Sequence, residues 1–185
     1  MKTLFAFFRL VRISNLLMIA LSLSLFYYLI LIPVHQDKLH STLVPFTTFE
    51  FVLFILSVVF IAAAGNIIND YFDFELDREF KPERPLAQGL FSLDTTMYLH
   101  MGFALSGIAL GYYLGWLVGY FSVGYIYIIC SLLLYIYSSY LKKIPLVGNV
   151  AISALTGFVF VLLLIFEANF LRVIFLKKAN MRSIS

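Results

Sequence analysis

Residues 46–68, FTTFEFVLFILSVVFIAAAGNII, form an almost unbroken apolar stretch that continues directly into residues 69–77, NDYFDFELD. A membrane-spanning helix needs about 20 mostly apolar residues, so the first part is long enough to cross a bilayer. The second part places four acidic residues at the end of that helix, where ionisable groups are costly and usually functional. This junction therefore predicts both the fold class and the position of the functional site.

The composition of the whole chain indicates a membrane protein. Of its 185 residues, 62% are apolar and 12% are charged, and the mean hydropathy is +0.97. Soluble domains are about half apolar and about a quarter charged. The 13 basic residues are scattered among apolar stretches, which argues against a nucleic-acid partner. The single cysteine, Cys130, excludes an intrachain disulfide and a two-cysteine metal site.

Five stretches are long and apolar enough to cross a bilayer, which predicts an all-α, polytopic transmembrane helical bundle. They cover residues 14–34, 46–68, 96–118, 119–140 and 144–166. The stretch before them predicts an amphipathic helix that lies on the membrane. Within the third span, glycines recur at intervals of four and predict a face for close helix packing: Gly107, Gly111, Gly115 and Gly119.

The basic residues in the short flanks predict the orientation, because such residues favour the cytoplasmic side. Eight of them fall on one predicted side: Lys2, Arg9, Arg12, Arg78, Lys81, Arg84, Lys142 and Lys143. We therefore expect an integral, multi-pass membrane protein with a cytoplasmic N-terminus, in the inner membrane if the cell is bacterial. Five spans would put the basic segment 167–185 outside, against this rule. Either the apolar stretch after residue 144 does not cross the membrane fully, or the tail is not the natural continuation of the preceding spans. We expect residues 1–166 to form the domain and 167–185 to be a tail of non-native continuation.

The acidic residues after the second span share one side of a continued helix. Asn69, Asp73 and Asp77 repeat every four residues, and Asp70 lies on the same stripe. Carboxylates that point the same way repel one another unless a cation neutralises them. Oxygen ligands suit Mg²⁺, which commonly shares one or two carboxylates with substrate phosphates. In the alternative, the acids form ordinary ion pairs with the basic residues of their own loop: Arg78, Lys81 and Arg84.

The pattern Asn69, Asp70, Asp73 and Asp77 resembles the first aspartate-rich motif, NDxxDxxxD, of the UbiA-type intramembrane prenyltransferases. In that family a basic residue, a proline, Arg-Pro-Leu and a glycine follow. This chain has KPERPL at residues 81–86 and a glycine at position 89. Further similarity lies in RISN, residues 12–15, and YLKKIPLVGN, residues 140–149, so that the resemblance covers roughly residues 9–160.

The resemblance implies Mg²⁺-dependent transfer of a prenyl group from a prenyl diphosphate to a small aromatic or glycerol-phosphate-type acceptor in the membrane. It implies catalytic roles for Asp70, Asp73 and Asp77, and metal binding by Asn69, Asp73 and Asp77. It implies substrate binding by Asn69, Lys81, Arg84 and Lys142, although Lys142 also suits simple anchoring at the cytoplasmic surface. Residues 143–149 are more similar to the branch that prenylates glycerol-phosphate ether lipids than to the quinone branch.

The resemblance also implies nine transmembrane helices and a second motif of the form DxxxD after the sixth. After Asp94 the only acid is Glu167, so the second motif is missing and five of nine helices are expected. We therefore expect the chain alone to be inactive or impaired, and a homo-oligomer is one way to bring two copies of the first motif together. The alternatives are a noncatalytic membrane scaffold or carrier with half of the fold, and a CDP-alcohol phosphotransferase. The latter class expects Asp-Gly and Ala-Arg pairs that do not precede Asp73 here.

Overall fold

The computed structural model describes residues 2–34, 46–144 and 146–182, with side chains for residues 3–34, 46–144 and 146–167. Within these ranges every regular element is helical, which confirms the predicted all-α class. The elements are α1 (Lys2–Leu10), α2 (Ile13–Phe26) with a π-helical extension η1 (Tyr27–Leu31), α4 (Thr48–Phe72), α5 (Phe74–Phe80), α6 (Leu93–Leu117), η2 (Phe121–Val123), α7 (Gly124–Ser139), η3 (Leu141–Lys143) and α8 (Val147–Arg182).

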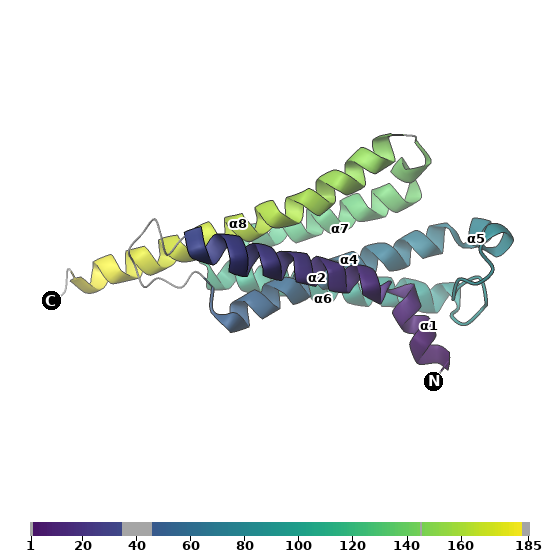
Figure 1. Ribbon diagram of the computed structural model, residues 1–185, viewed down its shortest axis with the longest axis horizontal. Coiled ribbons are helices and arrows are strands. Elements are labelled where there is room, and N and C mark those ends of the chain that lie inside the picture. Colours follow the sequence, from purple (N-terminus) through teal and green to yellow (C-terminus); the bar gives the residue numbers. More distant parts are fainter. Residues whose placement is uncertain (1, 35–45, 145, 183–185) are drawn as a thin grey trace.

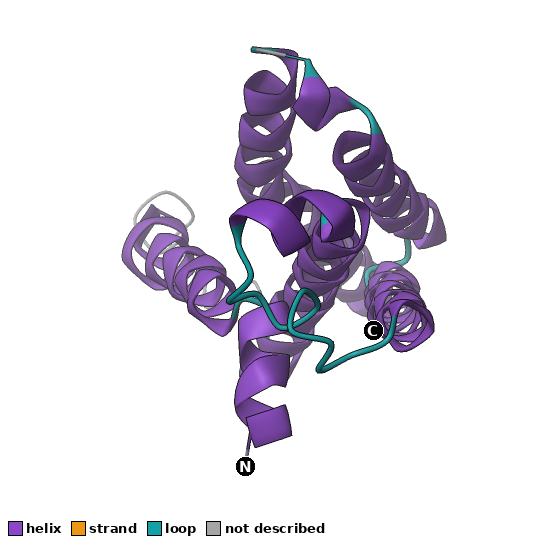
Figure 2. Ribbon diagram, turned by 90° about the vertical axis from the view of Figure 1, so that its right-hand side faces the viewer, coloured by secondary structure: helices purple, strands orange, loops and turns teal. Residues whose placement is uncertain are grey.

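The long helices α2, α4, α6, α7 and α8 run along the long axis of the molecule (Figure 1). Figure 2 looks along this bundle from the end that carries α5 and shows the loops crossing that end. The most extensive helix contact among the described elements joins α4 to α6, and α7 packs against both. The short helix α1 leaves the bundle axis at the α5 end (Figure 1).

Four helical segments of the described chain are long and apolar enough to cross a membrane: Ile13–Val34, Thr48–Phe72, Phe121–Ser139 and Val147–Glu167. They match four of the five predicted spans to within a few residues. The remaining predicted span coincides with α6, which has the same 25-residue length as α4. Its glycines, tyrosines and histidine make it less apolar than the other four.

Glycines in α6 allow the backbones to approach closely, as predicted from their spacing. A Cβ at Gly107 would lie 2.8 Å from the side chain of Ile61 in α4, and a Cβ at Gly111 would collide with the ring of Tyr127 in α7. The hydroxyl of Tyr127 is 2.8 Å from that of Ser57, in the buried interior. Small residues at such contacts are typical of helix packing in lipid, where close packing and interhelical hydrogen bonds drive association. These residues hold α4, α6 and α7 together.

The helix α8 continues through residue 167, where the predicted domain ends and the basic tail begins. Of that tail, Glu167 is buried, and the side chains of residues 168–185 lie outside the described residues.

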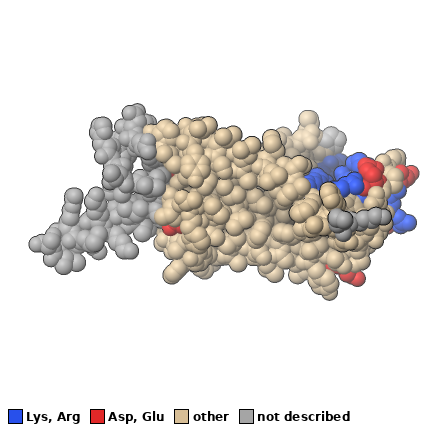
Figure 3. Space-filling view, turned by 60° about the horizontal axis from the view of Figure 1, so that its bottom comes forward, with Lys and Arg blue, Asp and Glu red and all other residues tan. Residues whose placement is uncertain are grey.

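The charged side chains gather at one end of the bundle. Figure 3 shows lysine, arginine and acidic side chains together at the end near α5, while the body of the visible face is almost free of charge. The ion pairs of the described residues join side chains from α4, α5 and the segments before α2, after α5 and after α7. Of the basic residues that the sequence predicted on one side of the membrane, Arg12, Lys81, Arg84 and Lys142 thus meet the acidic motif at this end.

Candidate functional site

The acidic motif lies where α4 passes into α5. Asp73 separates the two helices with φ −88° and ψ −1°, a small departure from helical geometry. The hydrogen bonds from Asp73 N to Asn69 O, at 3.1 Å, and from Asp77 N to Asp73 O, at 2.7 Å, keep the helical i to i−4 spacing. The predicted stripe of acids therefore survives the break between the helices.

The side chain of Asp70, near the end of α4, is buried. Its side chain is 4% exposed, and its Oδ1 accepts hydrogen bonds from Arg12 Nη2 and Arg84 Nη1, each at 2.7 Å. Burial of a carboxylate is costly unless charged partners and hydrogen bonds compensate for lost water. Two guanidinium groups on one oxygen provide that compensation.

Asp77 is also buried, and Arg84 links it to Asp70. Arg84 Nη1 lies 3.0 Å from Asp77 Oδ2, and Lys81 Nζ lies 4.0 Å from Asp77 Oδ1. Burial raises the pKa of Asp77; Arg84 and Lys81 lower the pKa, and the carboxylates of Asp73 and Asp70 raise it. Since the net shift is upward, the nearby basic residues do not fully offset the loss of water and the like charge. A further cation would stabilise this carboxylate.

Asp73 belongs to a second group of contacts on the other side of the stripe. Its Oδ2 accepts a hydrogen bond from Asn69 Nδ2 at 3.1 Å, and its Oδ1 lies 2.7 Å from Lys142 Nζ. The same ammonium group donates to Asn69 Oδ1 at 3.2 Å. Lys142 comes from η3, so the turn between α7 and α8 closes over the end of α4.

The turn between α1 and α2 contributes the remaining contacts. Asn66 in α4 donates from Nδ2 to the carbonyl oxygen of Val11 at 2.9 Å, and Arg9 Nη2 donates to the carbonyl oxygen of Glu83 at 2.8 Å. Arg12 has a left-handed backbone, with φ 56° and ψ 58°. These contacts fasten α1 to α4 and to the loop after α5.

A cavity of about 490 Å³ leads from this polar end into the bundle. Its polar end is lined by Arg12, Asn66 and Asn69, and its walls come from α2, α4, α7 and α8. Along α4 the lining residues extend from Asn69 to Val58, which corresponds to about 16 Å of helix. The cavity therefore combines a polar mouth, at which Arg12 carries a charge, with a long and mostly apolar interior.

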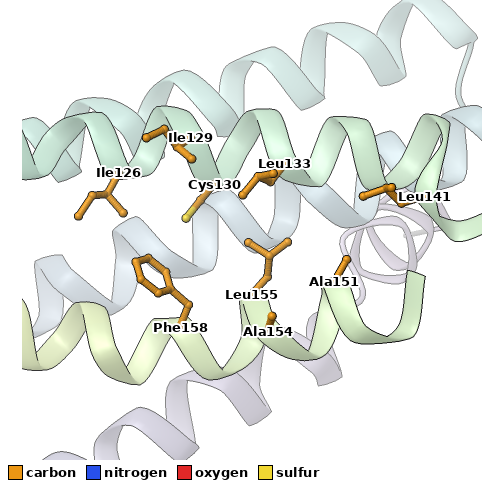
Figure 4. Close-up of a pocket in the computed structure, with 9 residues that line it drawn as sticks. All are labelled: Ile126, Ile129, Cys130, Leu133, Leu141, Ala151, Ala154, Leu155 and Phe158. Carbon is orange, nitrogen blue, oxygen red and sulfur yellow. The ribbon is translucent and has the colours of Figure 1, made fainter. Parts of the chain in front are cut away.

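A second cleft, of about 390 Å³, lies between α7 and α8. Figure 4 shows its side chains reaching toward one another from the two helices, among them Ile126, Leu133 and Ala151. All its lining residues are apolar, and it shares Cys130, Leu155 and Phe158 with the larger cavity. This cleft adds apolar volume beside the site, and Cys130 is the lining residue that the two cavities share on α7.

The oxygen donors of the site suit Mg²⁺ as a partner. Asn69, Asp73 and Asp77 offer amide and carboxylate oxygens, which are the ligands that this ion prefers. Among the described residues, no three His, Cys, Asp or Glu side chains lie close enough together to hold a metal ion by themselves. The set therefore fits an ion that takes one or two protein carboxylates and completes its shell with water and phosphate oxygens.

All the residues that the sequence predicted for the site lie in this cluster. Its two groups, joined by one helix face, contain Asp70, Asp77, Arg84 and Lys81 on one side, and Asn69, Asp73 and Lys142 on the other. The alternative of pairing within the acidic loop accounts for part of the network, because Arg84 and Lys81 do pair with acids. Arg78 pairs instead with exposed Glu75, at 4.0 Å, and its guanidinium carbon lies 5.5 Å from the centre of the Phe74 ring.

Sequence reasoning did not assign Arg12 and Asn66 to the site. Asn66 lies on the predicted polar stripe, one helical turn before Asp70, and Arg12 belongs to the RISN segment. The sequence feature that could have identified Arg12 and Asn66 is a polar side chain at the edge of an apolar span, which commonly marks a functional site.

Much of this chain is similar in sequence to known proteins. Residues 39–176 match the UbiA prenyltransferase family. Digeranylgeranylglyceryl phosphate synthase of Methanothermobacter thermautotrophicus is 45% identical over 116 residues, and the enzyme of the same name from Methanobrevibacter smithii is 39% identical over 111 residues. These alignments cover 61% and 60% of this chain, respectively, and 39% of each relative.

A solved structure concerned with digeranylgeranylglyceryl phosphate synthase in membranes has a similar fold. It superposes with a TM-score of 0.71 at 28% sequence identity, covering 88% of this chain and 52% of that protein. The chain thus spans about two fifths of the length of these curated relatives and about half of the solved structure.

Proposed function

The chain belongs to the UbiA prenyltransferase family, and from this we propose that it takes part in moving a prenyl group from a prenyl diphosphate to a lipid-precursor acceptor inside the membrane. The observation that carries the proposal is the cavity, whose charged mouth and apolar interior match an amphiphile with a phosphate head and a hydrocarbon tail. Arg12, Asn66 and Asn69 line the mouth, while residues such as Val58 and Leu162 line the interior.

In this proposal the basic side chains bind the diphosphate. Arg84 and Lys142 are positioned by buried or half-buried carboxylates, and Lys81 lies beside them with a more exposed ammonium group. Breaking the bond between carbon and the diphosphate oxygen leaves negative charge on the leaving group. Charged groups that are fixed before the reaction stabilise such charge without reorganising. Mg²⁺ held through Asn69, Asp73 and Asp77 would supply further positive charge at the same oxygens.

The interior of the cavity suits the other product of that cleavage, an electron-poor allylic carbon. The ring of Tyr137, on the last turn of α7 before Lys142, lines the cavity, and aromatic faces attract positive charge. The apolar walls keep out water that would compete with the acceptor. A hydroxyl oxygen of the acceptor forms the new bond to this carbon, and diphosphate and a proton leave.

We further propose a glycerol-phosphate lipid as the acceptor and a geranylgeranyl diphosphate as the donor. The support is the name of the relatives, digeranylgeranylglyceryl phosphate synthase, together with residues 143–149 of this chain, KIPLVGN. A phosphate on the acceptor would also need positive charge close to the mouth of the cavity. In this arrangement the charged end of the bundle faces the cytoplasm, which agrees with the basic flanks.

The 185 residues contain one aspartate-rich motif, and after Asp94 they contain one further acid, Glu167. We propose that they bind the diphosphate but transfer the prenyl group slowly unless a second acidic motif is supplied. A second copy of this chain or a separate segment could supply it.

The test uses the full chain in lipid nanodiscs with radiolabelled geranylgeranyl diphosphate and geranylgeranylglyceryl phosphate. We expect the chain to bind the donor only when Mg²⁺ is present, and to lose this binding after chelation by EDTA. Asp73→Asn should abolish the binding, whereas Glu75→Gln, at an 84% exposed side chain, should leave it intact. Equal donor binding with and without Mg²⁺ would refute the proposed role of the acidic motif.

A further inference from the structure

We propose that Arg12 is a positioning residue for the diphosphate site, acting through the buried carboxylate of Asp70 on the guanidinium of Arg84. This inference rests on the proposed function, since it assumes that Arg84 binds a diphosphate. It assigns a role in the site to the turn between α1 and α2.

The first supporting observation is the way Asp70 shares its oxygen. Arg12 Nη2 and Arg84 Nη1 each lie 2.7 Å from the same Oδ1, so the two nitrogens are less than 5.4 Å apart. Two like charges at that distance repel one another, and the carboxylate between them holds both in place. Since Asp70 is only 4% exposed, it offers little access to an incoming ligand and acts on the site through its arginines.

Second, the backbone of Arg12 adopts an unusual conformation. Its left-handed conformation, with φ 56°, is unfavourable for a residue with a Cβ. Such a conformation persists only where surrounding contacts determine it. The hydrogen bonds from Asn66 to the Val11 carbonyl and from Arg9 to the Glu83 carbonyl hold the turn from both sides. The contacts therefore direct the Arg12 side chain from the start of α2 into the bundle.

Third, Arg84 contacts both buried carboxylates of the site. Its Nη1 bonds both Asp70 and Asp77, so it sits between two buried carboxylates with a side chain that is 24% exposed. Without Arg12, the charge of Asp70 would act on Arg84 alone and draw it away from a bound diphosphate. Arg12 thus keeps Arg84 available by sharing Asp70 with it.

The experiment measures the affinity of nanodisc-embedded full chain for a radiolabelled, non-transferable thio analogue of geranylgeranyl diphosphate, with Mg²⁺. Arg12→Ala and Arg12→Gly should each weaken binding on the order of tenfold, as expected for loss of one charge-assisted hydrogen bond. Glycine tolerates the left-handed backbone, so Arg12→Gly removes the side chain while relieving the strain and stays informative if the alanine variant does not fold. Arg12→Lys should restore part of the affinity.

A double-mutant cycle separates positioning from direct contact. If Arg12 acts through Asp70, the combination of Arg12→Gly with Asp70→Asn should be no more than about twofold weaker than the worse single variant, because interacting residues are not additive. Multiplicative losses would mean that Arg12 contacts the diphosphate itself and would overturn the inference. The control Arg78→Ala removes the same charge from a 59% exposed side chain and should not change binding.

The same experiment separates the proposed function, binding of a prenyl diphosphate, from the positioning role of Arg12. If the unmodified chain does not bind the analogue, the proposed function fails. If it binds the analogue and Arg12→Gly binds equally well, only the positioning role fails.

Discussion

Lys142 Nζ lies 2.7 Å from Asp73 Oδ1 and 3.2 Å from Asn69 Oδ1, and this contact fastens the turn between α7 and α8 to the end of α4. Lys142 lies 73 residues after Asn69 along the chain. The Lys142 side chain is 13% exposed, so it is held inside the site rather than extended into the lipid headgroups. This finding favours a functional role for Lys142 over simple anchoring at the membrane surface.

Lys142→Gln should weaken binding of the diphosphate analogue roughly tenfold or more, because it removes a charge-assisted contact from Asp73 and a positive charge from the site. The measurement is radioligand binding in nanodiscs with Mg²⁺. Lys143→Gln is the matched control, because Lys143 is the next residue along the chain and its side chain is exposed. Equal losses in the two variants would indicate a general effect of surface charge and contradict the specific role.

Gly111→Ala should destabilise the bundle by about 2 kcal/mol, because the added methyl group would overlap with the ring of Tyr127. Unfolding of the purified protein by SDS in mixed micelles measures the change. Gly102→Ala makes the same substitution in the same helix at a position with open space, and should be neutral or slightly stabilising. If both variants behave alike, the close approach of α6 and α7 does not contribute to stability.

Tyr127→Phe should cost about 1 kcal/mol of stability, because it removes the hydrogen bond to Ser57 between α7 and α4. Ser57 keeps its bond to the Phe54 carbonyl, so no polar group is left without a partner by the change. The same SDS titration applies. Tyr98→Phe, at a side chain that is 74% exposed, should have no measurable effect.

Ser22→Trp should block the tail of a prenyl diphosphate, because Ser22 lines the cavity and indole would fill much of the space beside α2. We expect binding of the geranylgeranyl analogue to fall by at least tenfold, while binding of inorganic diphosphate stays unchanged. Leu21→Trp, one residue earlier and 54% exposed, is the control. A parallel loss of inorganic diphosphate binding would show that the substitution disturbs the charged mouth instead.

Much of this architecture could be predicted from the sequence because the constraints on it are local. Apolar length marks the spans, and the spacing of Gly107 and Gly111 marks the face along which α6 meets its neighbours. The i, i+4 spacing of Asn69, Asp73 and Asp77 places them on one stripe whatever surrounds them. The helical hydrogen bonds through Asp73 preserve that stripe.

The pairing within the site could not be predicted, because it depends on tertiary contacts. The acidic loop has three nearby basic residues, yet Asp70 takes one partner from position 12 and Asp73 takes its partner from position 142. Nothing local to Arg12 signals a left-handed backbone, since this conformation usually belongs to glycine. The pairing of each carboxylate with its basic residue is determined by how the start of α2 and η3 pack against α4.

The depth of the cavity has a consequence for how such a protein would discriminate among substrates. In water, each buried methylene group would add about 0.8 kcal/mol to binding. A prenyl tail that comes from the bilayer leaves one hydrocarbon medium for another, so this gain is largely absent. Affinity for a substrate of the proposed class must then come from contacts with the headgroup. The interior residues Val58 and Tyr127 would instead determine which tails fit, because a tail longer than the cavity would clash with their side chains.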